Sequence, residues 1–287
     1  MKCFYHSADL DGHCSGAIVL ERYPECVMIG INYGDPFPWD LIVPGEVVFM
    51  VDFSLQPFED MLRLDEICDL FWIDHHKTAI EAMERSGVLF GGFQGEGLGA
   101  CALVWSSLYP CLRLPYGVQL LAEYDVWKHE DANCLPFQYG MRLEDTSPGS
   151  PVWSRVFGGD LADHILRGET VLAYERKQSE VFARTCSFET EFMGLRCVAM
   201  NRQLTNSKAF DSVVDPDRHD AMLTFGFRKG VWYCSLYSAR EDVDVSAVAK
   251  QFGGGGAQGG RGVPVRGAAV RAGGEVRHGS GSRMVAA

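Results

Sequence analysis

The stretch that most constrains the fold is Leu70-Phe71-Trp72-Ile73-Asp74-His75-His76, in which four apolar residues run directly into an acid and two histidines. A short apolar run of this kind is typical of a strand that is buried on both faces. Three consecutive side chains that can bind a metal are hard to explain by packing alone. We therefore interpret the stretch as a buried strand followed by a loop that carries chemistry.

Three apolar runs upstream have the same character as Leu70 to Ile73. They predict strands at Lys2 to Tyr5, Val27 to Ile31 and Val47 to Val51. Helical patterns separate these runs. The alternation predicts an α/β fold with a mainly parallel sheet flanked by helices.

Polar residues follow three of the four predicted strands. They are His6 to Gly12 after the first strand, Asp52 to Ser54 after the third, and Asp74 to His76 after the fourth. Ligands of open α/β sheets bind outside the carboxyl ends of the strands. We therefore expect these three segments to meet at one edge of the sheet.

The chemistry of these segments favours a metal site. Carboxylates and imidazoles without thiolates suit Mn²⁺ or Mg²⁺ better than a structural zinc. A pair of such ions needs a bridging carboxylate and further ligands on both sides. Asp125 in Tyr124-Asp125-Val126-Trp127, further along the chain, is an additional candidate ligand. For any single Asp or His after a strand, a role as helix N-cap or loop residue is the alternative.

The second half of the chain predicts a smaller α/β unit. An amphipathic helical pattern runs from about Leu161 to Thr185, and apolar runs then predict strands and a last helix. The strands are expected at Leu195 to Ala199, Ala221 to Phe227 and Val231 to Leu236, and the helix at Val245 to Phe252. We place the metal-binding domain at 1–150, a helical linker at 151–187, the second domain at 188–256 and an atypical tail at 257–287.

The amino-acid composition restricts the kinds of molecule that the protein is expected to bind. The 287 residues hold 26 Lys and Arg against 38 Asp and Glu, for a net charge of −12, which argues against binding duplex DNA through a basic surface. The ten cysteines form no C-x-x-C pair, and no apolar leader or membrane-length apolar stretch is present. These features predict a cytoplasmic protein that does not associate with membranes.

The polar segments, taken together, resemble the four motifs of the DHH phosphoesterase superfamily, and the second unit resembles its associated domain, DHHA1. The second resemblance rests on residues 235–238, 242–246 and 252–256. It implies two Mn²⁺ ions, with Mg²⁺ as an alternative, a bridging Asp52, a catalytic Asp74 that orients His75, and a catalytic His76 that faces the phosphate. By position, the implied metal ligands are His6, Asp9, Asp11, Asp52, His75 and Asp125, and the implied substrate-binding residues are Ser238, Gly253, Gly254, Gly255 and Gly256.

Within this superfamily, the two-domain plan is most similar to the oligoribonuclease (nanoRNase) branch. That resemblance implies hydrolysis of short RNA to nucleoside 5′-monophosphates by metal-activated water, and it is compatible with a homodimer. One alternative is a phosphatase that acts on 3′-phosphoadenosine 5′-phosphate or another small nucleotide. The other is a vestigial nucleotide-binding protein with a damaged glycine loop.

The composition changes abruptly after Gly256. Residues 257–287 contain eight glycines and no Phe, Trp, Tyr, Leu or Ile. In the family, the glycine tract is followed by a histidine, and moving the reading frame of residues 256–264 forward by one base allows Gly-His-Lys/Arg-Ala-Ala-Gly-Val-Phe. We therefore expect an extra base within the codons of Gly253 to Gly256, with a genuine divergent tail as the competing interpretation.

Overall fold

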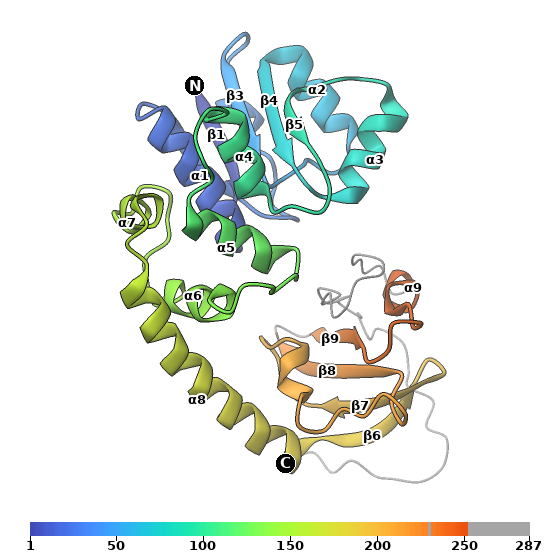
Figure 1. The fold of residues 1–287 in the computed structure, drawn as a ribbon. Coiled ribbons are helices and arrows are strands. Elements are labelled where there is room, and N and C mark those ends of the chain that lie inside the picture. The colour runs from blue at the N-terminus through green and yellow to red at the C-terminus, as the bar shows by residue number, and fades with distance from the viewer. Residues whose placement is uncertain (229–230, 252–287) are drawn as a thin grey trace. The chain divides into compact units, whose positions relative to one another are not determined.

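The computed structural model describes residues 1–228 and 231–251 (Figure 1). The chain divides into two compact units, Met1–Glu175 and Arg176–Ala287. The predicted glycine tract at 253–256 and the tail at 257–287 lie outside the described residues. Among the described helices, none is both long enough and apolar enough to cross a membrane.

The first unit is built on a five-stranded parallel sheet with the strand order β2-β1-β3-β4-β5. Its strands are β1 (Lys2–His6), β2 (Val27–Ile31), β3 (Val47–Val51), β4 (Asp69–Asp74) and β5 (Gly91–Gln94). Its helices are α1 (Leu10–Arg22), α2 (Glu59–Ile67), α3 (Lys77–Ser86), α4 (Ala100–Leu108), α5 (Tyr116–Asp125), α6 (Cys134–Met141) and α7 (Val152–Gly158), and a short 3-10 turn spans Trp39–Leu41. The predicted α/β class with a parallel sheet flanked by helices is confirmed.

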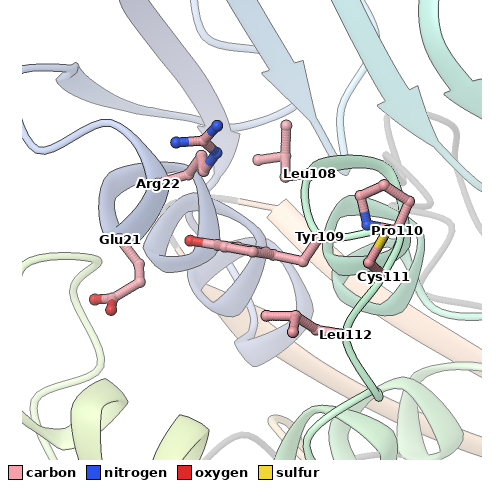
Figure 2. Close-up of a pocket in the computed structure, with 7 residues that line it drawn as sticks. All are labelled: Glu21, Arg22, Leu108, Tyr109, Pro110, Cys111 and Leu112. Carbon is pink, nitrogen blue, oxygen red and sulfur yellow. The ribbon is translucent and has the colours of Figure 1, made fainter.

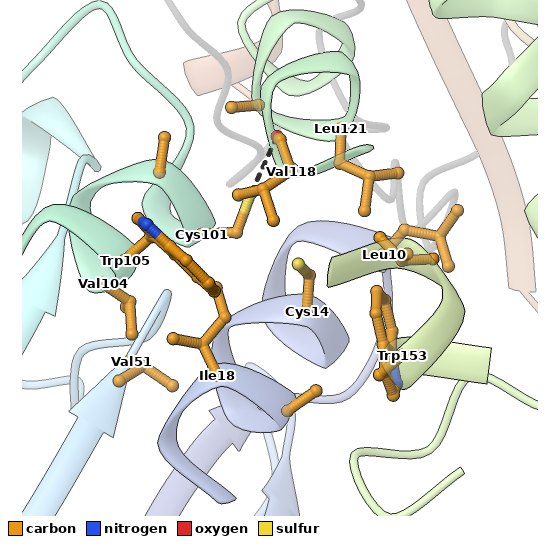
Figure 3. Packing of buried hydrophobic residues seen from close by; sticks show 14 of the residues in the cluster. Leu10, Cys14, Ile18, Val51, Cys101, Val104, Trp105, Val118, Leu121 and Trp153 are labelled. Carbon is orange, nitrogen blue, oxygen red and sulfur yellow. Dashed lines mark hydrogen bonds between the residues drawn. The ribbon is translucent and has the colours of Figure 1, made fainter. Parts of the chain in front are cut away.

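Both faces of the central strands β1, β3 and β4 are largely buried, because alternate residues of these strands face opposite layers of helices. Phe49 and Val51 of β3 pack with α1, α4 and α5, whereas Val48 and Met50 pack with α2 and α3. Figure 3 shows the first layer, in which Ile18 of α1 lies close to Val51 and Trp105. Because β3 and β4 are buried on both faces, their sequences are nearly continuous apolar runs.

Strand β5 was not predicted, since its sequence Gly91-Gly92-Phe93-Gln94 reads as a glycine-rich loop. The structure requires glycine at position 92, where φ is +98° and a Cβ would overlap the carbonyl of Trp72. The strand is an edge strand, and the Gln94 side chain donates a hydrogen bond to Trp72 O at 2.6 Å. Glycine stands at position 92 because the backbones of β4 and β5 approach closely there, although glycine has a low intrinsic preference for strands.

The long helix α8 (Ala162–Cys186) begins in the first unit and ends in the second. Its first turns cross α6 at very short range, because a Cβ on Gly140 would overlap the carbonyl of His164 and one on Gly168 would overlap that of Pro136. His164 is fully buried at this crossing, and neither ring nitrogen has a hydrogen-bond partner among the described residues.

Relative to the wild-type chain, His164→Leu should gain stability as the pH falls from 7 to 5. Burial and the charge of Arg155 lower the pKa of His164 below 6.5, against the opposing charges of Glu144 and Asp163. At this residue the unfolded chain then binds more protons than the folded chain as the pH drops below about 6.5, which costs the wild-type chain stability that the variant keeps. Urea unfolding of both proteins at pH 7 and pH 5 should show a larger difference in stability at pH 5, in favour of His164→Leu. An equal difference at the two pH values would contradict this expectation.

The second unit contains a four-stranded mixed sheet with the order β6-β7-β8-β9. Its strands are β6 (Phe188–Phe192), β7 (Leu195–Met200), β8 (Ala221–Arg228) and β9 (Val231–Ser238), and its helices are a 3-10 turn (Ser207–Phe210) and α9 (Val245–Lys250). Only the β7–β8 pair is parallel. β6 was not predicted, because its sequence Phe188-Glu189-Thr190-Glu191-Phe192 has no continuous apolar run.

Candidate metal centre

The predicted polar segments meet at the carboxyl edge of the first sheet. β1, β3 and β4 are neighbouring parallel strands, with Tyr5 paired to Val51 and Val51 paired to Ile73. The residues that follow these pairs are therefore brought together at one level of the sheet. Helix α1 adds Asp9 and Asp11 from its first turn, and α5 adds Asp125 from its last.

One group of potential ligands consists of His6, Asp9 and Asp52, whose donor atoms all lie within 4.8 Å of one another. His6 Nδ1 is 3.2 Å from Asp9 Oδ2 and 3.5 Å from Asp52 Oδ2. His6 and Asp52 are buried, with 5% and 2% of their surfaces exposed. The group offers one imidazole and two carboxylates to a cation.

A second group consists of Asp11, His75 and Asp125. His75 Nε2 lies 3.2 Å from Asp125 Oδ2 and 3.9 Å from Asp11 Oδ2. The same nitrogen is 3.4 Å from Asp52 Oδ1. One oxygen of Asp52 therefore approaches the first group and the other approaches the second, as a bridging carboxylate would.

Asp74 makes a different contact from the one expected. Its Oδ1 accepts hydrogen bonds from the backbone N–H of His75 at 2.7 Å and from the Nδ1 of His76 at 2.6 Å. Asp74 is fully buried, and it holds the ring of His76 rather than the ring of His75. Burial lowers the pKa of His76, but the charge of Asp74 outweighs it and raises that pKa to about 9. The orienting role that we assigned toward His75 therefore falls on His76 instead.

The backbone restricts which residue types can stand at positions 52 and 12. Asp52 has a φ of +53°, a left-handed conformation that Asp and Asn adopt more readily than most residues. Asp9 caps α1 by accepting the Gly12 N–H at 3.0 Å. A Cβ on Gly12 would overlap the carbonyl of His6, so α1 can approach the end of β1 only with glycine there.

Asp11 is held by a helix that sequence reasoning did not connect to it. Its two oxygens accept the backbone N–H groups of Ala100 at 2.6 Å and Cys101 at 2.9 Å, at the start of α4. These N–H groups have no partner within their own helix, and the helix dipole favours a carboxylate at this end. The contact spans about ninety residues of sequence, so no local signal could reveal it.

The carboxylates of the centre perturb the histidines strongly. Burial by itself lowers the pKa of His6, but the interactions with Asp52 and Asp9 outweigh it and raise that pKa to about 10. Burial also lowers the pKa of His75, while its contacts with Asp52 and Asp125 raise it to about 11. Protons on these rings balance the buried negative charge, and a cation that binds here must displace them.

Two carboxylates of the centre, Asp11 and Asp125, have raised pKa values. Burial and the neighbouring charge of Asp52 raise the pKa of Asp11 to about 7, against the opposing charge of His75. Burial and the charge of Asp11 likewise raise the pKa of Asp125 to about 7. Buried like charges of this kind are typical of metal and catalytic sites.

The donor atoms fit a cation. His6 Nδ1, Asp52 Oδ1 and Asp74 Oδ2 are buried and have no hydrogen-bond partner within the described part of the chain. Buried polar atoms are normally paired, and an unpaired cluster of them points to an ion or water. Nitrogen and carboxylate oxygen donors without thiolates match Mn²⁺ or Mg²⁺.

Tyr33 is an aromatic residue at the centre that escaped prediction. It follows β2, and its ring centroid lies 5.6 Å from that of His6 and 6.1 Å from that of His76. The segment around Tyr33 reads in the sequence as an ordinary turn, so only its spatial neighbours identify it.

The substrate-binding residues expected in the second unit remain predictions. Ser238 ends β9, and its hydroxyl accepts the Arg240 N–H at 3.2 Å and donates to the Arg240 carbonyl. Gly253, Gly254, Gly255 and Gly256 lie outside the described residues.

A cavity of about 350 Å³ lies away from this centre, at the other end of α1 (Figure 2). Glu21 and Arg22 line it together with residues 108–112 after α4. Its lining contains none of the predicted ligands, all of which in the first unit lie at the carboxyl edge of the sheet.

No protein-family model matches the chain, and no curated protein matches its sequence. Solved structures are similar in fold. A pGpG-specific phosphodiesterase from Vibrio cholerae matches with a TM-score of 0.52 and 10% identity over 90% of each chain. An uncharacterized protein from Helicobacter pylori G27 has a TM-score of 0.44 and 12% identity over 90% of each chain. An exopolyphosphatase-related protein from Bacteroides fragilis has a TM-score of 0.45 and 13% identity, over 90% of this chain and 84% of its own. The first likeness shows the fold, a parallel sheet flanked by helices with a second mixed sheet.

Proposed function

We propose that this chain is a divalent-metal-dependent phosphodiesterase of the DHH type that hydrolyses short oligoribonucleotides to nucleoside 5′-monophosphates. The observation that carries the proposal is the position of Asp52 between two three-residue ligand groups. Its two oxygens lie 3.5 Å from His6 Nδ1 and 3.4 Å from His75 Nε2. Paired ions that share a carboxylate are the usual device for in-line displacement at phosphorus.

Two Mn²⁺ ions held by these groups would offset the charge of a phosphodiester and lower the pKa of bound water. The chain's own residues supply the rest of the centre. The α4 amides hold Asp11, and Asp74 holds the Nδ1 side of His76. This leaves His76 Nε2 to donate a hydrogen bond to a phosphate oxygen, and the 35% exposure of the His76 side chain is compatible with that role.

The choice of short oligonucleotides has two supports. The net charge of −12 disfavours long polyanions, which bind mainly through Lys and Arg. The phosphodiesterase from Vibrio cholerae that shares the fold is named for a dinucleotide, pGpG.

The test is Mn²⁺-dependent hydrolysis of a labelled RNA dinucleotide by the purified full chain. We expect nucleoside 5′-monophosphates as products, no activity in His75→Ala, and near-normal activity in Asp69→Asn, whose exposed carboxylate lies at the opposite end of β4. Faster turnover of 3′-phosphoadenosine 5′-phosphate than of the dinucleotide would instead indicate the small-nucleotide phosphatase.

A second arm tests the reading frame after the glycine tract. A chain restored to the shifted frame should be assayed beside the wild-type chain. If the wild-type chain and the restored chain both bind Mn²⁺ in calorimetry yet hydrolyse neither substrate, the phosphodiesterase proposal fails in favour of a vestigial binding protein. Activity in the restored chain alone would assign the loss to the altered C-terminus.

A further inference from the structure

Tyr33 lies directly on the metal centre, although it belongs to none of the predicted motifs. It follows β2, the strand next to β1, and so reaches the same edge of the sheet. Its ring lies edge-on to His6 and to His76 at interplanar angles of 63° and 77°. His6 belongs to one ligand group and His76 is held by Asp74, so Tyr33 borders the place where the scissile phosphate is expected.

The position of this ring is set by the turn that carries it. Asp35 N–H donates to the Asn32 carbonyl at 3.0 Å, and the Asn32 N–H donates to Asp35 Oδ2 at 3.0 Å. Gly34 between them has a φ of +97°. The turn is closed by these bonds from both ends, which limits the freedom of the Tyr33 backbone.

One part of the Tyr33 side chain is supported by neighbouring rings, and another part is exposed to solvent. The ring centroid is 4.6 Å from that of Phe53, which is buried with 3% of its surface exposed. Tyr33 itself keeps 39% of its surface exposed. A large aromatic side chain that is backed by a buried ring and open to solvent beside a metal centre offers a stacking surface to a planar ligand.

We infer that Tyr33 is a specificity-determining residue, whose ring stacks on the nucleoside base adjoining the scissile phosphate. This inference rests on the proposed function and deepens it, because it assigns recognition to the base as well as to the phosphate. Stacking of a base on an aromatic side chain does not depend on which base is present. The enzyme should therefore require a base beside the phosphate without strong preference among the four.

The test compares Tyr33→Ala and Tyr33→Phe with the wild-type chain on two substrates, an RNA dinucleotide and the same dinucleotide made abasic at one position or the other. Tyr33→Ala should raise KM for the intact dinucleotide about 5- to 150-fold, the range of measured base stacking, with little change in kcat. Tyr33→Phe should keep the wild-type KM. For one of the two abasic substrates, the wild-type and Ala variants should be equal.

A binding measurement keeps the test independent of turnover. The Kd of a phosphorothioate dinucleotide should rise in Tyr33→Ala by the same factor as KM, while the affinity for Mn²⁺ alone stays unchanged. Tyr174→Ala, which removes a 62% exposed tyrosine of α8, is the matched control.

Two results would overturn the inference. Unchanged KM and Kd in Tyr33→Ala would show that the ring does not touch the substrate. A fall in Mn²⁺ affinity with equal loss of activity on all substrates would show that the ring only supports His6. If the wild-type chain hydrolyses no dinucleotide, the proposed function fails, and the phosphorothioate Kd still decides the role of Tyr33.

Discussion

Asp52→Asn should abolish phosphodiester hydrolysis, with a loss on the order of 10³-fold or more in kcat, equivalent to about 4 kcal/mol in the barrier. Among the residues that the structure describes, Asp52 is the one carboxylate that approaches both His6 and His75, and only 2% of its surface is exposed. Asparagine keeps the shape and tolerates the φ of +53°, so the fold should survive. The change therefore removes the charge that two cations would share.

The measurement pairs steady-state kinetics with calorimetric titration of Mn²⁺. We expect fewer than two ions per chain in Asp52→Asn and an unchanged circular dichroism spectrum. Asp69→Asn is the control, because it makes the same chemical change at the exposed first residue of β4, the end of the strand away from the candidate centre. It should leave kcat and the number of bound Mn²⁺ ions as in the wild-type chain. Retention of two Mn²⁺ ions and normal turnover by Asp52→Asn would rule out its bridging role.

Gly12→Ala should destabilise the chain by about 1–3 kcal/mol and reduce activity on the order of 10²-fold. A Cβ at this position would overlap the backbone carbonyl of His6, so α1 must move away from β1. That movement displaces Asp9 and Asp11, which α1 carries. Urea unfolding and the Mn²⁺ affinity should report the two effects.

Gly158→Ala is the matched control for this substitution. Gly158 also lies in a helix, the last residue of α7, and an added Cβ there meets nothing within 4 Å. Alanine should leave stability unchanged or slightly higher, because it restricts the unfolded chain. Equal behaviour of the two variants would show that the contact between α1 and β1 tolerates a methyl group.

The strands that could be predicted are those with a continuous apolar run. Val27–Ile31 and Val47–Val51 have the predicted bounds, and β1 and β4 differ from prediction only at their ends. The central strands carry this run because the fold buries them, whereas the edge strand β2 carries it although only Ile31 is buried. β5 and β6 were missed, because glycines in β5 and glutamates in β6 interrupt the apolar run.

The candidate centre was predictable in its residue types and less so in its contacts. Polar residues directly after buried strands indicated the right edge of the sheet, since parallel strands end together. The partner of Asp74 was predicted wrongly, because the neighbours His75 and His76 cannot be told apart by sequence position. Their ring directions depend on the turn into α3.

The sequence by itself determined the α/β class, the edge of the sheet at which the candidate ligands meet, and donor types suited to a hard divalent cation. These follow from patterns within a few residues of each other. Only the tertiary structure decided that Asp52 lies between two ligand groups, that α4 holds Asp11, and that Tyr33 borders His6 and His76. Such contacts join residues far apart in the chain, and the packing of helices on the sheet sets them.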